Sequence, residues 1–452
     1  MKPVIAIVGR ANVGKSALFN RLTGEKKAIV EDLPGTTRDR VFADTSLDGR
    51  EVTLIDTGGL DPLPGSLMDL KIRHQIKAAI VEADVIIFLV DSRSGIIAGD
   101  HEIADMLRKS DKQVILAASK VDNAALEQQI HDFHQLGLGA PMAISAHHGR
   151  GIYELIEKIT SLIPQTIAEP VGTGLMPKLA IVGRPNAGKS MLLNTIVGEE
   201  RAIVDSIPGT TRDAIDTIFQ YNDRHILLID TAGIRHKGRR SVGIEYYSLI
   251  RSLRAINRCD IALLVIDATE FVTAQDIHIA GYIREAFKGL ILIVNKWDLV
   301  HNQKPAVFEK MIRNRIKFIA HAPVLFVSAK EGTGINKVIP AAMDIWQERQ
   351  KQLPDDVIDK LIKSTAEEHA PPRKGLRRLK IVRAYQDGVN PPSFSFLVND
   401  PELVHFSYER YLENRLRHTF GFSGTALRLR FKKAATGKTS RRKPGKTGQV
   451  KR

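Results

Sequence analysis

The stretch that decides the fold reads Gly9-Arg10-Ala11-Asn12-Val13-Gly14-Lys15-Ser16. It follows an apolar run at Val4–Val8 and precedes a helical pattern at residues 17–22. Glycine, four residues and then Gly-Lys-Ser form the phosphate-loop pattern, in which backbone N–H groups and the positive end of the next helix face phosphate oxygens. The lysine adds a point charge for the β- and γ-phosphates, and the serine hydroxyl is a ligand for Mg²⁺. The stretch therefore predicts a phosphate site between a strand and a helix.

A second copy of this stretch lies 174 residues further along, and it reads Gly183-Arg184-Pro185-Asn186-Ala187-Gly188-Lys189-Ser190. The motif Pro-Gly-Thr-Thr-Arg-Asp at 34–39 recurs at the same offset, at 208–213. Asp-Thr-Gly-Gly at 56–59 becomes Asp-Thr-Ala-Gly at 230–233. A constant offset over three motifs indicates a duplicated domain, and the period is too long for a solenoid repeat.

Each copy alternates apolar, β-rich runs with helical patterns, which predicts an α/β domain with a mainly parallel sheet and helices on both faces. The strands predicted in the first copy are Val4–Val8, Val52–Ile55, Val85–Val90, Val114–Ala117 and Pro141–Ile144. Those predicted in the second copy are Leu179–Val182, His225–Ile229, Ile261–Ile266, Leu290–Val294 and Val324–Val327. In such a domain the ligand is expected at the carboxyl ends of the strands.

Residues that meet the metal ion and the γ-phosphate are expected at strand ends and in the Pro-Gly-rich loops. A strand-end aspartate can hold Mg²⁺ through water, a following glycine can donate its backbone N–H to the γ-phosphate, and a loop threonine can complete the metal shell. The predicted switch residues are Thr37, Asp56, Thr57, Gly58, Gly59, Leu60, Thr211, Asp230, Thr231, Ala232, Gly233 and Ile234. The predicted Mg²⁺ ligands are Ser16, Thr37, Asp56, Ser190, Thr211 and Asp230.

The choice of base is expected from Asn295-Lys296-Trp297-Asp298, which follows an apolar run. The aspartate can accept hydrogen bonds from the ring N–H and the amino group of guanine, an arrangement that adenine does not offer. The lysine stem packs over the base, the asparagine ties this loop to the phosphate loop, and a backbone N–H at Ser328-Ala329 meets the guanine carbonyl. The first copy has Ser119-Lys120-Val121-Asp122 and Ser145-Ala146, with serine in place of asparagine. We therefore expect guanine specificity there too, with weaker bracing of the loop.

From Pro354 the pattern changes to helix, strand, strand, helix and strand. The elements predicted there are a helix at 355–368, strands at 379–386 and 393–399, a helix at 401–419 and a strand at 425–431. Residues 371–452 hold 20 of the 66 basic residues and 5 of the 51 acidic ones, so the whole net charge of +15 lies in this part of the chain. Such an excess predicts a polyanionic partner, with nucleic acid as the first choice.

Together these motifs resemble the double-domain bacterial GTPases of the Der (EngA) family over residues 1 to about 431. Residues 234–238 and 401–414 also carry the resemblance. It implies two tandem P-loop G domains and a KH-like α+β domain. It implies hydrolysis of GTP to GDP and phosphate, and a monomeric protein that binds ribosomal particles or rRNA and acts in assembly of the large ribosomal subunit. The sequence departs from the family pattern at Ala11, Ala17 and Ser119, all in the first copy.

The resemblance also bears on the catalytic charge. Many GTPases carry a glutamine after the DxxG motif, but Leu60 and Ile234 stand there and cannot orient a water molecule. Asn12 and Asn186 match the asparagine of potassium-dependent relatives, in which K⁺ occupies the place of an arginine finger. GTP or GDP, Mg²⁺ and K⁺ are therefore the expected cofactors. The alternative for both asparagines is local capping of a turn.

Contact with RNA is expected in the third domain and the tail. Gly421–Gly424 matches the GxxG clamp of RNA-binding KH domains but lies between a predicted helix and strand, so we interpret it as helix-end and turn glycines. The basic residues expected to contact RNA are Arg373, Lys374, Arg377, Arg378, Lys380, Lys438, Arg441, Arg442 and Lys443. Residues 432–452 are basic with almost no apolar side chains, which predicts a disordered tail that binds phosphates without sequence preference.

The predicted domain boundaries are 1–163 for the first G domain, 164–177 for a linker, 178–353 for the second G domain, 354–431 for the KH-like domain and 432–452 for the tail. The chain has a single cysteine, Cys259, and no secretory leader or apolar run long enough for a membrane helix, so we expect a cytoplasmic protein.

Two other functions stay open. A tRNA-modification GTPase shares the loop asparagine, but it would want a substrate-binding domain and a terminal reactive cysteine, whereas Cys259 lies within the second G domain. A non-enzymatic alternative is an RNA-binding adaptor whose first G domain only holds nucleotide.

Overall fold

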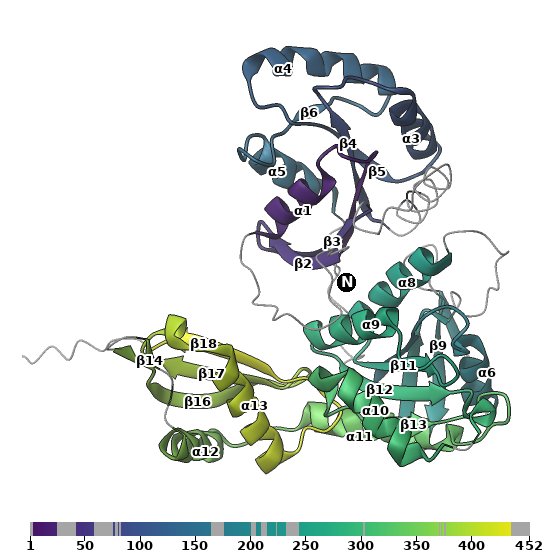
Figure 1. Ribbon diagram of the computed structural model, residues 1–452, viewed down its shortest axis with the longest axis vertical. Coiled ribbons are helices and arrows are strands. Elements are labelled where there is room, and N and C mark those ends of the chain that lie inside the picture. The colour runs from purple at the N-terminus through teal and green to yellow at the C-terminus, as the bar shows by residue number, and fades with distance from the viewer. Residues whose placement is uncertain are drawn as a thin grey trace, which may run out of the picture. The chain divides into compact units, whose positions relative to one another are not determined.

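The structure is a computed structural model in which the chain forms two compact units, residues 1–344 and 345–452 (Figure 1). The residues that it describes are 3–24, 42–57, 76, 80, 83–163, 176–199, 205–208, 215–222, 224–231, 244–301, 303–369, 371, 373–374 and 377–434. Residues 164–175 of the predicted linker and residues 435–452 of the predicted tail lie outside these ranges. No helix in the described part of the chain is long and apolar enough to cross a membrane.

The first G domain is built on a sheet in which every neighbouring pair is parallel except β2 with β3. Its strand order β2-β3-β1-β4-β5-β6 corresponds to Phe42–Leu47, Arg50–Asp56, Val4–Val8, Val85–Asp91, Gln113–Ser119 and Met142–Ala143. Its described helices are α1 (Lys15–Thr23), α3 (Ala98–Arg108), α4 (Ala124–Gln129), η1 (Ile130–Leu136) and α5 (Ile152–Leu162). Because β1 lies between β3 and β4, the loop that leaves it meets the ends of both neighbours.

The second G domain repeats this arrangement and adds an edge strand, β8, which pairs antiparallel with β9. The order β13-β12-β11-β7-β10-β9-β8 corresponds to Val324–Phe326, Gly289–Asn295, Ile261–Asp267, Lys178–Val182, Arg224–Ile229, Ile215–Tyr221 and Asp205–Pro208. Its described helices are α6 (Lys189–Glu199), α8 (Ile244–Arg258), α9 (Ala274–Glu285), η3 (Trp297–Leu299), α10 (Pro305–Arg315), η4 (Lys317–Ile319), η5 (Ile335–Lys337) and α11 (Val338–Gln350).

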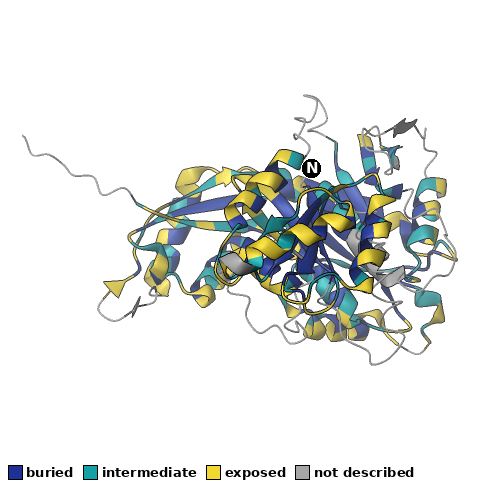
Figure 2. Cartoon of the chain, turned by 90° about the horizontal axis from the view of Figure 1, so that it is seen from above, coloured by how far each residue is buried: buried dark blue, intermediate teal, exposed yellow. Residues whose placement is uncertain are grey.

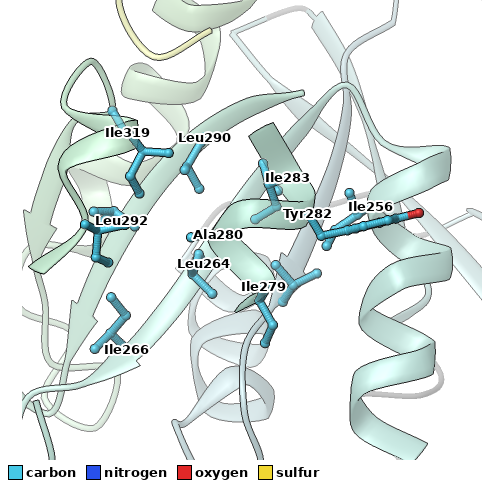
Figure 3. Close-up of a cluster of buried hydrophobic side chains, with 14 of the residues drawn as sticks. Ile256, Leu264, Ile266, Ile279, Ala280, Tyr282, Ile283, Leu290, Leu292 and Ile319 are labelled. Carbon is cyan, nitrogen blue, oxygen red and sulfur yellow. The ribbon is translucent and has the colours of Figure 1, made fainter. Parts of the chain in front are cut away.

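The cores of both G domains lie between the sheet and the helices that cover it. Strands β4 and β11 are buried along their full length, as their unbroken apolar sequences predict for strands covered on both faces. Figure 2 shows buried residues along the strands and exposed ones on the outer faces of the helices. In the second domain, side chains of β11 and β12 pack against α9 (Figure 3), among them Leu264, Ile266, Leu290, Leu292, Ile279 and Ile283. Each fully buried aliphatic side chain of this kind stabilises the fold by about 1.5–3 kcal/mol.

The third domain is an α+β unit whose sheet joins an antiparallel pair, β16 with β17, to a parallel pair, β17 with β18. Its elements are α12 (Asp355–Glu368), β14 (Arg373–Lys374), β15 (Arg377–Arg378), β16 (Ile381–Gly388), β17 (Ser393–Val398), η6 (Pro401–Leu403), α13 (Phe406–Phe420) and β18 (Arg428–Lys433). Helix α13 ends at Phe420, and Gly421 and Gly424 both have positive φ, of 92° and 69°. The interpretation of these glycines as helix-end and turn residues is confirmed.

The predicted fold class is confirmed, and the differences lie at edges and ends. The edge strands β2 and β8, the strand β9 next to β8, and the short pair β14 and β15 were not predicted. The predicted helix over 401–419 is instead a single turn, η6, followed by α13, because His405 caps α13 with its ring nitrogen and restarts the helix. The predicted strand over 141–144 is reduced to the two residues of β6.

Candidate nucleotide-binding sites

The two phosphate loops adopt the same backbone conformation at corresponding positions. Gly9 and Gly183 have φ of 154° and 142°, and a Cβ at either would lie within 2.5 Å of a carbonyl oxygen of the neighbouring strand β4 or β11. The asparagines of both loops have φ of 64°. Glycine is therefore required where each loop leaves its strand, since the backbone there passes too close to the next strand for any side chain.

Backbone carbonyls hold both phosphate-loop lysines, of which Lys15 is buried and Lys189 is half-buried. Lys15 Nζ donates to the carbonyl oxygens of Gly9 and Arg10, at 2.9 and 2.7 Å. Lys189 Nζ donates to those of Gly183 and Arg184, at 2.7 Å each. Burial lowers the pKa of the Lys15 ammonium, and it lowers the pKa of the Lys189 ammonium to about 8. An anionic phosphate beside either ammonium would supply the charge compensation that burial removes.

Two of the three predicted metal ligands of the first site, Ser16 and Asp56, meet where α1 begins. Ser16 Oγ donates to Asp56 Oδ2 at 2.6 Å, and Asp56 is buried at the end of β3. A hydroxyl and a carboxylate oxygen form a hard donor set of the kind that Mg²⁺ prefers. In the second site, Asp230 follows β10 with φ of 56°, and its N–H donates to Asp216 Oδ1 at 2.9 Å. The other predicted switch residues, Thr37, Gly58, Gly59, Leu60, Thr211, Ala232, Gly233 and Ile234, lie outside the described residues.

The base loop of the second site is braced by Asn295, which is buried. Its Nδ2 donates to the carbonyl oxygen of Ala187 in the phosphate loop at 2.9 Å, and its Oδ1 accepts from the backbone N–H of Ala329 at 3.0 Å. One side chain therefore joins the phosphate loop to the Ser328-Ala329 turn. The sequence analysis predicted its contact with the phosphate loop but not its contact with Ala329. Trp297 packs its ring edge-to-face on Phe308 and Phe326, which fixes the loop from its other side.

Ser119 makes a different connection in the first site. Its hydroxyl lies 2.6 Å from the carbonyl oxygen of Val13 in the phosphate loop and 2.9 Å from that of Val90 in β4. A hydroxyl is too short to reach the Ser145-Ala146 turn from this position. That turn is tied instead to Asp122, the aspartate predicted to read the base, because Ser145 Oγ donates to Asp122 Oδ1 at 2.7 Å.

Two aspartates that the sequence analysis did not assign hold the base-loop lysines. Asp91 and Asp267 end β4 and β11, and each accepts a hydrogen bond from a lysine Nζ, that of Lys120 at 2.7 Å and that of Lys296 at 2.5 Å. Burial opposes the charge of the Asp267 carboxyl, but hydrogen bonds from Lys296 and Thr269 outweigh it and keep the pKa of that carboxyl low. A strand-end aspartate present at the same place in both copies was the signal that could have identified them.

A second unassigned pair anchors the arginine of each phosphate loop. Arg10 Nε lies 3.4 Å from a carboxylate oxygen of Asp100, and Arg184 Nε lies 3.7 Å from one of Asp276. Both aspartates are fully buried near the start of the helix after β4 or β11, and burial raises the pKa of both carboxyls. These pairs tie each phosphate loop to α3 or α9.

The predicted RNA-contacting residues are only partly described. Arg377, Arg378 and Lys380 are exposed, and Arg377 pairs with Asp400 at 3.2 Å. The side chains of Arg373 and Lys374 and all of Lys438, Arg441, Arg442 and Lys443 lie outside the described residues. Two further cations on β18, Arg430 and Lys432, pair with Asp387 at 3.1 and 3.3 Å.

Comparison with known proteins identifies family models that match all three domains. The model of the family described as "50S ribosome-binding GTPase" matches residues 4–120 and again 178–296. The model described as "KH-domain-like of EngA bacterial GTPase enzymes, C-terminal" matches residues 352–432. Among solved structures, Era from Aquifex aeolicus matches with 21% identity and a TM-score of 0.30, over 57% of this chain and 92% of that chain.

Curated relatives match over nearly the whole chain. GTPase Der of Desulforamulus reducens is 46% identical over 434 residues, 96% of this chain and 98% of the relative. GTPase Der of Desulfitobacterium hafniense (strain DSM 10664 / DCB-2) is 48% identical over 431 residues, 95% of this chain and 97% of the relative. With two phosphate-loop sites, a KH-like third domain and this degree of identity over its length, the chain is a GTPase that belongs to the Der (EngA) family.

Proposed function

We propose that this GTPase is a switch that binds ribosomal particles through their RNA and acts in assembly of the large ribosomal subunit. The observation that carries the proposal is the joining, in one chain, of two phosphate-loop domains matched by a 50S ribosome-binding GTPase model to a KH-like domain with exposed Arg377, Arg378 and Lys380. Nucleotide state would alter the switch loops and so change which RNA surface the basic part of the chain engages. We further propose that the protein acts as a cytoplasmic monomer with the domain boundaries given above.

The side chains that bind the nucleotide act by placement and charge. Lys15 and Lys189 face the phosphates, and Asp122 and Asp298 select guanine. Ser16 with Asp56, and Ser190 with Asp230, are the proposed ligands of Mg²⁺, which would offset the negative charge of the phosphates. The Ser16–Asp56 contact of 2.6 Å supports this assignment in the first site.

Asn12 and Asn186 are the proposed ligands of K⁺. Both side chains are exposed, and within the described residues neither amide forms a hydrogen bond. That observation favours a ligand role over the capping of a turn, because a capping asparagine accepts a backbone N–H nearby. A K⁺ ion held there would place positive charge beside the transferred phosphoryl group, which compensates for the lack of an arginine finger and of a glutamine at Leu60 and Ile234.

Co-sedimentation with ribosomal particles tests the proposed partner and switch together. The full chain should pellet with large-subunit particles more in a non-hydrolysable GTP analogue than in GDP, and raising the salt from 50 to 200 mM should weaken binding by about tenfold or more, as phosphate contacts require. A variant that ends at Ala434 should bind more weakly and with a flatter salt dependence. The Lys15→Ala, Lys189→Ala double variant is the control that should lose the difference between nucleotides. Absence of pelleting in both nucleotide states would disprove the proposal.

The brace formed by Asn295 predicts a difference in affinity between the two sites. Asn295→Ser should weaken binding of GDP at the second site by about tenfold, because a serine there cannot reach Ala329 and leaves its buried N–H unpaired. Titration with fluorescent GDP measures this in a chain whose first site carries Asp122→Asn. The matched reverse change, Ser119→Asn, should tighten binding at the first site. Equal affinities before and after both changes would show that the brace is irrelevant to binding.

A further inference from the structure

The loops that follow β4 and β11 have the same backbone anchor and different side chains. Two residues after the strand-end aspartate, Arg93 N donates to Asp91 Oδ1 at 3.0 Å, and Thr269 N donates to Asp267 Oδ1 at 2.9 Å. The Thr269 hydroxyl turns back to the same aspartate, at 2.7 Å. The side chain of Arg93 instead extends away from Asp91. Arg93 and Thr269 therefore occupy equivalent positions but contact different residues.

Arg93 reaches the base-reading aspartate of the first site. Its Nη2 donates to Asp122 Oδ2 at 2.6 Å, while Ser145 Oγ holds Oδ1 at 2.7 Å. His148 Nε2 lies further away, 3.9 Å from Oδ1. The hydrogen bonds from Ser145 and Arg93 hold the pKa of the Asp122 carboxyl below its ordinary value. Both oxygens are thus held by donors that come from separate loops, which fixes the plane of the carboxylate.

The second site lacks this arrangement. Asp298, the counterpart of Asp122, forms no hydrogen bond or ion pair within the described part of the chain. Its loop is braced through Asn295 instead. The first site cannot use that brace, because the hydroxyl of Ser119 reaches only Val13 and Val90. The two sites therefore brace the base loop by different side chains.

We propose that Arg93 is a positioning residue for guanine recognition in the first site, where the chain Ser145–Asp122–Arg93 replaces the missing asparagine brace. Guanine presents a ring N–H and an amino group side by side. It therefore binds most tightly to a carboxylate whose two oxygens already lie in the plane of the base. A carboxylate that rotates freely must be ordered when guanine binds, and this ordering lowers the affinity. The inference rests on the proposed role of Asp122 as the base-reading residue.

The test is binding of nucleotides to the full chain carrying Asp298→Asn, so that GDP reports on the first site. Arg93→Thr, which copies Thr269, should weaken binding of GDP by about two- to fivefold, the size expected for an exposed charge pair. The same change should weaken binding of IDP less. Hypoxanthine, the base of IDP, lacks the amino group that donates to the second carboxylate oxygen of Asp122. Arg93→Lys should keep part of the affinity. Arg93 is exposed, so folding is not at risk.

Rescue by Ser119→Asn distinguishes a positioning role of Arg93 from a general effect of its charge on GDP binding. In a chain that carries Ser119→Asn, the change Arg93→Thr should have no effect on affinity for GDP, because the asparagine brace is restored. Arg150→Thr is the matched control: Arg150 is exposed and pairs with Glu127 on the same domain, so its loss should leave binding of GDP unchanged.

Tighter binding in Arg93→Thr would overturn the inference, since it would mean that the arginine competes with guanine for Asp122. An equal loss for GDP and IDP, or a loss that Ser119→Asn does not rescue, would also overturn it. If the starting chain does not bind GDP at the first site, the proposed function of that site fails, which is a separate outcome.

Discussion

Replacing K⁺ by Na⁺ at equal ionic strength should slow hydrolysis of GTP by about a thousandfold, the lower range of what an arginine finger contributes. Hydrolysis requires a positive group that neutralises the charge on the transferred phosphoryl group. The side chains of Leu60 and Ile234 are apolar and cannot supply it. Asn12 and Asn186 are both held at φ of 64° with exposed amides, so each can offer its oxygen to a large monovalent cation. Na⁺ is smaller and does not span the same set of ligands. Release of phosphate in matched KCl and NaCl measures the effect.

Substitutions in the phosphate loops locate the cation. Asn186→Ala should remove most of the K⁺ stimulation that the second site contributes, and Asn12→Ala that of the first, while the rate in NaCl stays as it was. Asn194→Ala is a suitable control, because Asn194 lies on the exposed face of α6, away from the loop. Equal rates in the two salts would remove both asparagines from consideration as ligands of a catalytic cation.

Asp298→Asn should convert the second site from guanine to xanthine, with a change in relative affinity of about a thousandfold or more. The carboxylate accepts from the ring N–H and from the amino group of guanine. The N–H of an asparagine amide would face the amino group of guanine, so that two donors would oppose each other. Xanthine has a carbonyl oxygen in place of that amino group, and this oxygen can accept from the asparagine N–H. Sites built on such hydrogen bonds discriminate strongly because a mismatch leaves buried groups unpaired. Competition between labelled GDP and XDP measures the preference.

The same substitution in the first site provides the comparison. Asp122→Asn should also reverse the preference, but by less, because Ser145 and Arg93 hold a carboxylate and fit an amide less well. A chain with Asp298→Asn that still prefers GDP would show that this aspartate does not read the base.

Much of the fold could be predicted because it rests on strong local patterns. Strand β4 reads as an unbroken apolar run, and Gly9 and Gly183 stand where a Cβ would lie within 2.5 Å of a carbonyl oxygen of the neighbouring strand. The edge strands were missed because their sequences are mixed: β2 carries Asp44 and Ser46 on an exposed face, and of its side chains from Ala43 to Leu47 only Leu47 is buried. Their pairing depends on the strand beside them rather than on their own composition.

In the candidate sites too, some contacts could be predicted from the motifs and others could not. The reach of Asn295 to the phosphate loop followed from its place in the motif. The partners of Ser119 did not, because which carbonyl a short hydroxyl meets depends on ångström-scale placement of β4. The Arg93–Asp122 contact joins residues 29 apart through the ends of two strands, and nothing in the sequence marks that arginine as a partner of the base loop.

The pairing of β1 with β3 and β4 also bears on how the chain is made. Every strand that β1 touches lies within the first 91 residues, so the centre of the first sheet is complete before β7, its counterpart, begins at Lys178. Domains emerging from the ribosome fold as units, the N-terminal one first. The order of synthesis thus protects two near-copies of one sheet from exchanging strands with each other. A refolding chain released all at once from denaturant has no such protection.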